Sequence, residues 1–305
     1  MSRVSRSAAE RLGYSARDRL LIINCDDFGC SRSANAAIER GMREGCATSA
    51  SLMVPCPWAK PAADQSRDLD IGVHLTLTSE YPAYRWSSIT GAASLHDKDG
   101  YLPKTVREVW SRAEPDDIER ECAAQIERAL EWGVDVTHLN SHMNILEIER
   151  TYFEIYLRLA KRFALPLRLS EPSSLPFAYI SRATIAKAAI AMVDCFYAPP
   201  WGEPARTGLF SHVKKLAPGL TEIALHPVED SDELRAYDTE FADVRIDDAE
   251  CVMDEGLKNL IGSSGIRLLG FRPLRDLMRG QAGETEHTGA TPVQAKGTRA
   301  AMRVV

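Results

Sequence analysis

Short apolar runs alternate with helical segments along most of the chain. The runs have the length of buried strands and lie at 20–25, 49–54, 71–77, 134–139, 165–170, 196–201, 221–226 and 266–271. Helical patterns separate many of them, most clearly over 33–44, 115–132, 149–163, 183–194 and 249–261. This alternation predicts βαβ units and an α/β fold with a parallel sheet. About seven such units favour a barrel over an open doubly wound sheet.

The two ends of the chain differ in composition from its body. Residues 1–17 are polar and predict a flexible lead-in, 18–278 predict a single barrel domain, and 279–305 predict a disordered tail. Both ends are basic although the formal net charge is -6, so the body is acidic. An acidic body argues against nucleic acid as a partner, because such binding needs clustered Lys and Arg.

The cysteines and the hydropathy of the chain indicate where in the cell the protein is expected. The chain has 7 cysteines, and none of them form a C-x-x-C pair, so zinc-ribbon and thioredoxin interpretations have no support. No secretory signal precedes the first apolar run. No stretch approaches the roughly 20 apolar residues of a membrane span. We therefore expect a cytoplasmic protein without a membrane span.

Polar side chains recur where the apolar runs end. They are Asp26 with Asp27, His74, His138 with His142, and His226. The carboxyl ends of the strands build the active site in barrels and open α/β sheets. One histidine after a strand is weak evidence, since a buried histidine often only satisfies the core. The repetition of this placement is what indicates a functional site.

Adjacent carboxylates after a buried run suggest a metal ion. Alone, Asp26 and Asp27 would suit a turn or a helix N-cap. Two buried like charges are costly, however, and a cation removes that cost for one of them while the other serves as a base. His74 and His142 would complete a site with open coordination positions. Such ligands suit Zn²⁺, Mn²⁺, Co²⁺ or Ni²⁺, whereas Mg²⁺ prefers more oxygen.

Three further residues have possible roles around this site. His138 would point to the opposite face from Leu139 and would contact the metal ligands rather than the metal itself. His226 precedes a proline and would protonate a leaving amine, although a buried hydrogen-bonded histidine is an equal alternative. Arg168 would orient and acidify Asp26 through a bidentate contact.

Four motifs in order resemble the YdjC-like (ChbG/HpnK) family of carbohydrate deacetylases. They are Asn24-Cys-Asp-Asp-Phe-Gly29, Gly72-Val-His-Leu-Thr-Leu77, Thr137-His-Leu-Asn-Ser-His142 and Leu225-His-Pro227. The resemblance implies a distorted (β/α) barrel of the glycoside hydrolase/deacetylase type. It also implies a hydrolase that removes an N-acetyl group from an amino sugar or oligosaccharide by attack of metal-bound water.

The resemblance also implies roles for individual residues. Asp27, His74 and His142 would hold a divalent ion, Mg²⁺ or Zn²⁺, with Asp26 as the base and His226 as the acid. The chain departs from the family pattern at Asn140, where the family usually has Asp. This change affects the surroundings of the metal and leaves the three ligands in place.

The long segment 79–113 lacks regular periodicity and is rich in aromatic residues, which is typical of a functional loop. Tyr84, Trp86 and Trp201 would stack on sugar faces, although packing is an equal alternative for loop aromatics. Two other functions remain open. One is a catalytically weakened sugar-binding or regulatory relative, which Asn140 supports, and the other is a hydrolase of another non-peptide C–N bond. A homodimer is the expected assembly.

Overall fold

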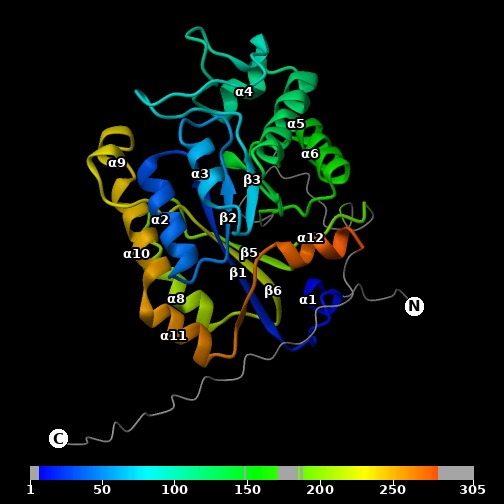
Figure 1. Cartoon of the computed structure of the whole chain (residues 1–305), viewed down its shortest axis with the longest axis vertical. Helices are drawn as coiled ribbons and strands as arrows, with labels where there is room; N and C mark the ends of the chain where they lie inside the picture. The colour runs from blue at the N-terminus through cyan, green and yellow to red at the C-terminus, as the bar shows by residue number, and fades with distance from the viewer. Residues whose placement is uncertain (1–6, 148, 171–184, 186–187, 281–305) are drawn as a thin grey trace, which may run out of the picture.

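A curled sheet of parallel strands forms the centre of the molecule (Figure 1). The computed structural model describes residues 7–147, 149–170, 185 and 188–280. Its strands are β1 (Arg19–Phe28), β2 (Ser49–Leu52), β3 (Ile71–Leu75), β4 (Leu139–Ser141), β5 (Cys195–Tyr197), β6 (Gly219–Leu225) and β7 (Arg267–Leu268). Their order is β4-β3-β2-β1-β6-β5, and β7 pairs with the start of β1. The predicted parallel sheet is therefore confirmed.

Irregular segments complete the wall between β4 and β5. Leu139 forms an isolated parallel bridge with Leu167. The Leu167 N–H donates to the Ala191 carbonyl at 3.1 Å, and the Asp194 N–H donates to the Leu220 carbonyl at 2.8 Å. The strand predicted over 165–170 is thus reduced to a single bridge. Because single contacts replace ladders here, the architecture is a distorted (β/α) barrel, as predicted.

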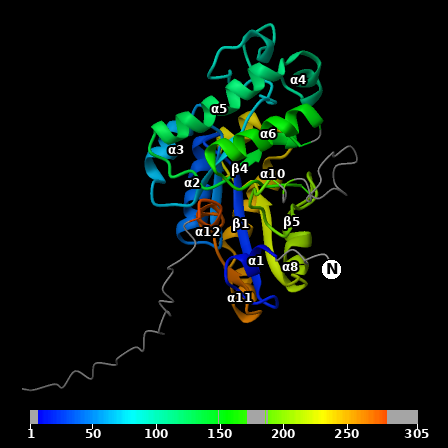
Figure 2. The same ribbon diagram turned by 90° about the vertical axis from the view of Figure 1, so that its right-hand side faces the viewer.

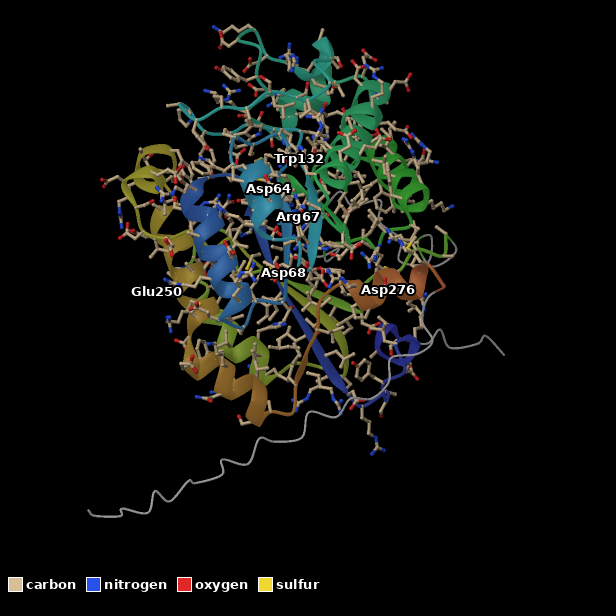
Figure 3. All side chains as sticks on the ribbon, viewed as in Figure 1. Asp64, Arg67, Asp68, Trp132, Glu250 and Asp276 are labelled. Carbon is tan, nitrogen blue, oxygen red and sulfur yellow. The ribbon has the colours of Figure 1, made fainter. Side chains whose placement is uncertain are left out.

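Helices cover the outside of the sheet (Figures 1 and 2). The longer ones are α2 (Arg32–Arg43), α5 (Pro115–Glu131), α6 (Arg150–Phe163), α8 (Arg206–Lys214), α10 (Ala242–Met253) and α11 (Glu255–Ser263). The shorter ones are α1 (Ala8–Arg11), α3 (Ala59–Gln65), α4 (Val106–Arg112), α9 (Asp232–Tyr237) and α12 (Arg272–Met278). α5 packs against α6, and α10 packs against α2 and α8. Charged side chains cover the outer surface, as the labelled Asp64, Arg67, Asp68 and Glu250 show (Figure 3).

Several predicted helices differ in the structure. The helix predicted over 249–261 is two helices, because the Asp254 side chain accepts a hydrogen bond from the Leu257 N–H and caps α11. In the segment 183–194, residues 188–194 are not helical, and 183, 184, 186 and 187 lie outside the described residues. The sequence patterns did not predict α8, α9 or α12.

The inside of the barrel is apolar at one end and polar at the other. Successive residues of a strand point to opposite faces, so Leu20, Ile22, Asn24 and Asp26 share one face of β1. Leu20 and Ile22 belong to a small apolar cluster with Phe271. Asn24 and Asp26 follow and are hydrogen-bonded to each other. The larger apolar core lies on the other face, between the sheet and the helices.

Part of the predicted flexible lead-in 1–17 forms the helix α1, while residues 1–6 lie outside the described residues. Ala8 and Ala9 of α1 are buried, and the Ala8 N–H donates to Asp194 Oδ1 at 2.8 Å. Ser7 and Glu10 form a capping box that fixes this turn. Most of the predicted tail, 281–305, lies outside the described residues. Among the described residues, no helix has both the length and the apolar character of a membrane span.

Candidate metal centre and active site

Asp26 and Asp27 lie on β1 at a β-bulge. The register with β2 shifts between Cys25 and Phe28, and Asp27 has a φ of 63°. A bulge redirects a side chain and is common next to active sites. Here it gives the two neighbouring carboxylates separate sets of partners. A left-handed conformation is unfavourable for a residue with a Cβ, so the contacts of Asp27 must hold it in place.

The side chains of Asp27, His74 and His142 converge, as predicted. His74 Nε2 lies 3.1 Å from His142 Nδ1 and 3.4 Å from Asp27 Oδ1. His142 Nδ1 lies 3.5 Å from the same carboxylate oxygen. Two ligand atoms at about 2.0–2.1 Å from a tetrahedral ion are about 3.3–3.4 Å apart. All three side chains are buried, so their spacing fits one divalent ion.

Two hydrogen bonds fix which ring nitrogens face this centre. Asn140 directs its Nδ2 toward the Asp26 carboxylate, so its Oδ1 accepts from His74 Nδ1 at 2.7 Å. The Glu80 carboxylate accepts from His142 Nε2 at 3.1 Å. A neutral imidazole protonated on one nitrogen has a lone pair on the other. When both rings are neutral and protonated on these outer nitrogens, His74 Nε2 and His142 Nδ1 both present lone pairs to the centre, as metal ligation requires.

Asp27 completes this set of acceptors. Its Oδ1 is a buried oxygen without a hydrogen-bond partner, and its Oδ2 accepts from Arg245 Nη1 at 2.8 Å. Burial raises the pKa of Asp27, but the positive charge of Arg245 opposes this effect, and the net pKa is well below the usual range. Three converging acceptors without a donor repel one another unless a cation lies among them. The donor set therefore fits a metal ion, and two imidazoles with one carboxylate suit zinc and similar ions.

Arg168 connects two buried carboxylates. Its Nη1 donates to Asp26 Oδ2, while its Nε and Nη2 contact Glu222 Oε1 at 2.7 and 2.5 Å. The predicted bidentate contact with Asp26 is therefore wrong. Only Nη1 of Arg168 contacts Asp26, because its other two nitrogens contact Glu222 on β6. Burial raises the pKa of Asp26, but Arg168, His74 and His226 lower it by more, so the carboxyl is ionised at neutral pH.

His226 follows β6 and lies close to Asp26. Its Nε2 is 3.7 Å from Asp26 Oδ2, and its side chain is 23% exposed. Its backbone N–H donates to Asp248 Oδ2 at 2.7 Å. Burial lowers the pKa of His226 to about 4, although Asp27 and Asp26 raise it. The imidazole is thus neutral at pH 7 and faces a cleft lined by Ala198, Pro199, Pro200, Trp201, Glu203, Ala224, Val244 and Asp248.

The three predicted sugar-stacking residues have different environments. Trp201 is 53% exposed and lies edge-on to His226, with ring centroids 5.1 Å apart. Trp86 is only 3% exposed and donates from Nε1 to the Thr78 carbonyl, so its face is unavailable to a sugar. Tyr84 is half-buried and donates its hydroxyl to the Cys30 carbonyl. Only Trp201 combines exposure with a place beside the site.

His138 and Asn140 share a face of the chain but lie at different depths. Asn140 contacts both His74 and Asp26, so it does lie in the surroundings of the candidate metal centre. His138 lies two residues earlier and stacks on Phe271, with centroids 3.9 Å apart. Its Nδ1 contacts Thr137 Oγ1 at 3.1 Å. The structure places His138 in the barrel interior and shows no hydrogen bond from it to a ligand.

Sequence reasoning missed three charged residues of the site. Glu222 interrupts the apolar strand β6, and a charge inside such a run is a signal that we could have used. Glu80 lies in a segment without periodicity, and Arg245 lies on a helix 218 positions from Asp27. No spacing rule connects either of these two residues with the ligands.

The comparison with known proteins identifies the family. A family model described as YdjC-like protein matches residues 20–262. The chain belongs to the YdjC-like family. The matched range contains Asp26, Asp27, His74, His142 and His226, so the whole candidate site lies within the shared region.

Relatives of this YdjC-like chain have been named for their activity. A protein of Thermus thermophilus named carbohydrate deacetylase is 33% identical over 233 residues, which is 74% of this chain and 84% of that protein. A carbohydrate deacetylase of Geobacillus stearothermophilus is 29% identical over 262 residues, 83% of this chain and 97% of that protein. A crystal structure from Enterococcus faecalis, whose name refers to cellobiose-phosphate cleavage, matches with a TM-score of 0.71 and 23% identity, covering 84% of this chain and 99% of that one. This structure supports the fold.

Proposed function

We propose that this YdjC-like protein is a metal-dependent hydrolase that removes an N-acetyl group from an amino sugar or oligosaccharide. The names of its relatives support the reaction class. The convergence of Asp27, His74 and His142 on one buried point supports the metal dependence, and this observation carries the proposal. A divalent ion held there would supply Lewis-acid activation of the acetyl carbonyl and of water. The donor set favours Zn²⁺ or a similar ion over Mg²⁺.

Asp26 and His226 would move the protons. Asp26 is ionised at neutral pH and accepts the proton of the attacking water. His226 is neutral at that pH, so it must first gain a proton before it can donate one. Its Nε2 is 3.7 Å from Asp26 Oδ2, which makes Asp26 the natural source. His226 then protonates the nitrogen as the C–N bond breaks, and Asp26 is ready for another cycle.

Four further residues support the proposed reaction, three by holding these groups and one by offering a surface for the sugar. Arg168 and Glu222 fix the Asp26 carboxylate from the barrel interior. Asn140 holds the tautomer of His74 that presents Nε2 to the ion. Trp201 offers an exposed ring at the cleft, where a sugar face can stack. These roles do not favour the weakened relative that Asn140 suggested, because this residue supports both the base and a ligand.

The decisive experiment measures metal content together with deacetylation. Purified protein is reconstituted with Zn²⁺ and compared with His142→Ala, with His212→Ala as the control, since His212 lies on α8, stacks on Tyr197 and is not one of the converging residues. We expect about one ion per chain and acetate release from N-acetylated sugars for the wild type and the control. We expect neither for His142→Ala.

The other results point to the alternatives. Wild-type protein that binds no ion after reconstitution contradicts the proposal. Bound metal without turnover on a broad panel of acetylated sugars favours a sugar-binding or regulatory role. Turnover of cyclic or acylated non-sugar amides alone favours a hydrolase of another C–N bond.

Two properties of the whole protein stay proposals. A reducing, cytoplasmic location is supported by six buried cysteines that form no disulfide. A homodimer is the second proposal, and light scattering of the purified protein would test it.

A further inference from the structure

Arg245 makes an unusually complete set of contacts beside the metal centre. Its Nη1 donates to Asp27 Oδ2 at 2.8 Å, and its Nε donates to Asp238 Oδ2 at 2.7 Å. Its Nη2 donates to the Tyr81 hydroxyl at 2.8 Å. The Trp201 ring lies 5.3 Å from the guanidinium carbon. Arg245 lies on α10 and is 3% exposed. Its three hydrogen-bond partners are buried as well, so they fix the position of the guanidinium group.

The contact with Asp27 determines how this carboxylate can bind a cation. Arg245 occupies Oδ2, and only Oδ1 faces the two histidines. The guanidinium also draws negative charge away from the ligand, which leaves a bound ion more electrophilic. Because Asp27 has a left-handed backbone, its carboxylate needs a partner that holds this direction. A planar guanidinium with three occupied donor directions provides such a partner.

The contact with Tyr81 reaches the long segment 79–113. Tyr81 is buried at its start and packs edge-on against Trp86 and Tyr237, at centroid distances of 6.0 and 4.8 Å. Its neighbour Glu80 accepts the hydrogen bond from His142 Nε2. Two successive residues of this segment therefore contact the metal centre along separate routes, one to His142 directly and one to Asp27 through Arg245.

We propose that Arg245 is a positioning residue that keeps Asp27 a one-oxygen ligand and, through Tyr81, links the metal centre to the segment 79–113. This inference rests on the metal-dependent function proposed above. A displacement of the segment would move Tyr81 and hence Arg245, so segment position and metal affinity are coupled. Thermodynamic linkage makes the coupling reciprocal: what shifts the segment changes metal affinity, and a bound ion steadies the segment.

The test uses Co²⁺ alone as the probe, because its visible spectrum reports the ligand geometry as well as the affinity. Arg245→Lys keeps the charge but cannot hold three acceptors in a fixed plane, and we expect about a 10–100-fold loss of Co²⁺ affinity with an altered spectrum. Tyr81→Phe removes one hydroxyl, and we expect about a three- to tenfold loss.

Tyr237→Phe is the matched control for Tyr81→Phe. It removes a buried hydroxyl from the same aromatic cluster, and that hydroxyl contacts Ser31 at 3.1 Å rather than Arg245. We expect its Co²⁺ affinity to stay within about twofold of the wild type. If Arg245→Lys fails to fold, the two tyrosine variants still decide the question.

The outcomes separate this inference from the proposed function. Unchanged Co²⁺ affinity and spectrum in Tyr81→Phe and Arg245→Lys, with normal binding by the wild type, overturn only the positioning role. Equal losses in Tyr81→Phe and Tyr237→Phe overturn it too, because they would reflect general packing. Failure of the wild type to bind Co²⁺ overturns the metal centre itself.

Discussion

Asn140 Oδ1 accepts a hydrogen bond from His74 Nδ1 at 2.7 Å, while the amide nitrogen of the same side chain donates to Asp26. One neutral side chain thus sets the tautomer of the proposed ligand His74 and stabilises the ionised form of the proposed base Asp26. An amide serves both partners at once because it has an acceptor and a donor at opposite corners. A carboxylate at this position would have to share a proton with Asp26.

Removal of this amide should weaken metal binding. Asn140→Ala frees His74 to rotate or to protonate Nε2, and we expect about a 10–100-fold loss of Zn²⁺ affinity in a competition titration. Ser51→Ala is the control, because Ser51 Oγ bonds Asp26 and Asn140 without touching His74. Similar losses in both variants would contradict the tautomer argument.

The two tryptophans that the sequence analysis expected to stack on sugars should respond differently to substitution. Trp201 is 53% exposed, so Trp201→Ala should leave stability almost unchanged and raise KM for an acetylated sugar about tenfold. Trp86 is 3% exposed, so Trp86→Ala should lower the free energy of unfolding by about 3–5 kcal/mol. Urea unfolding and steady-state kinetics on both variants check this. A loss of substrate affinity in Trp86→Ala without destabilisation would show that Trp86 contacts the sugar.

Glu147 should make the protein less stable as pH rises. Burial raises the pKa of this carboxyl from 4.5 to about 7, despite hydrogen bonds from Ser170. Between these two values the folded state binds more protons than the unfolded state, so stability falls with increasing pH and stays low above the folded pKa. The contribution of Glu147 should drop by about 3 kcal/mol between about pH 5 and about pH 8.

Glu147→Gln removes this titration and keeps an acceptor for the Ser170 N–H, which lies 2.8 Å from Oε2. The variant should therefore gain stability relative to the wild type as pH rises, in urea unfolding at the two pH values. Exposed Glu154→Gln on α6 is the control. If the difference between Glu147→Gln and the wild type is the same at both pH values, the carboxyl does not titrate in this range.

The sequence predicted the candidate site best where polar side chains lie at the carboxyl ends of the predicted strands. Asp27, His74 and His142 follow or lie in short apolar runs, and parallel strands bring their carboxyl ends together. Their convergence could therefore be predicted without knowing any side-chain direction. Asn140 lies on the same face of the chain as His142, so its place beside the centre was predictable, whereas its contacts with His74 and Asp26 were not.

Other features of the structure could not be predicted, because they depend on tertiary packing that no local sequence pattern indicates. The partners of Arg168 were partly missed because the Glu222 carboxylate comes from a neighbouring strand that is distant in sequence. Trp86 and Trp201 are both loop aromatics, and only the folded chain distinguishes the buried one from the exposed one. The wall at 165–170 was predicted as a strand because its composition is apolar, but only Leu167 makes a bridge. Burial explains that composition without a ladder.

The anchoring of the segment 79–113 limits how this enzyme scaffold can change. Glu80 contacts His142, and Tyr81 contacts Arg245. The part of the segment that carries α4 lies at the top of Figure 1, away from these two contacts. Exchange of the outer part for that of a relative should alter which sugars fit while sparing the reaction centre. A graft that begins before residue 82 would also replace Glu80 or Tyr81, which contact the residues of the metal centre. Changes of substrate specificity are therefore best made beyond residue 82.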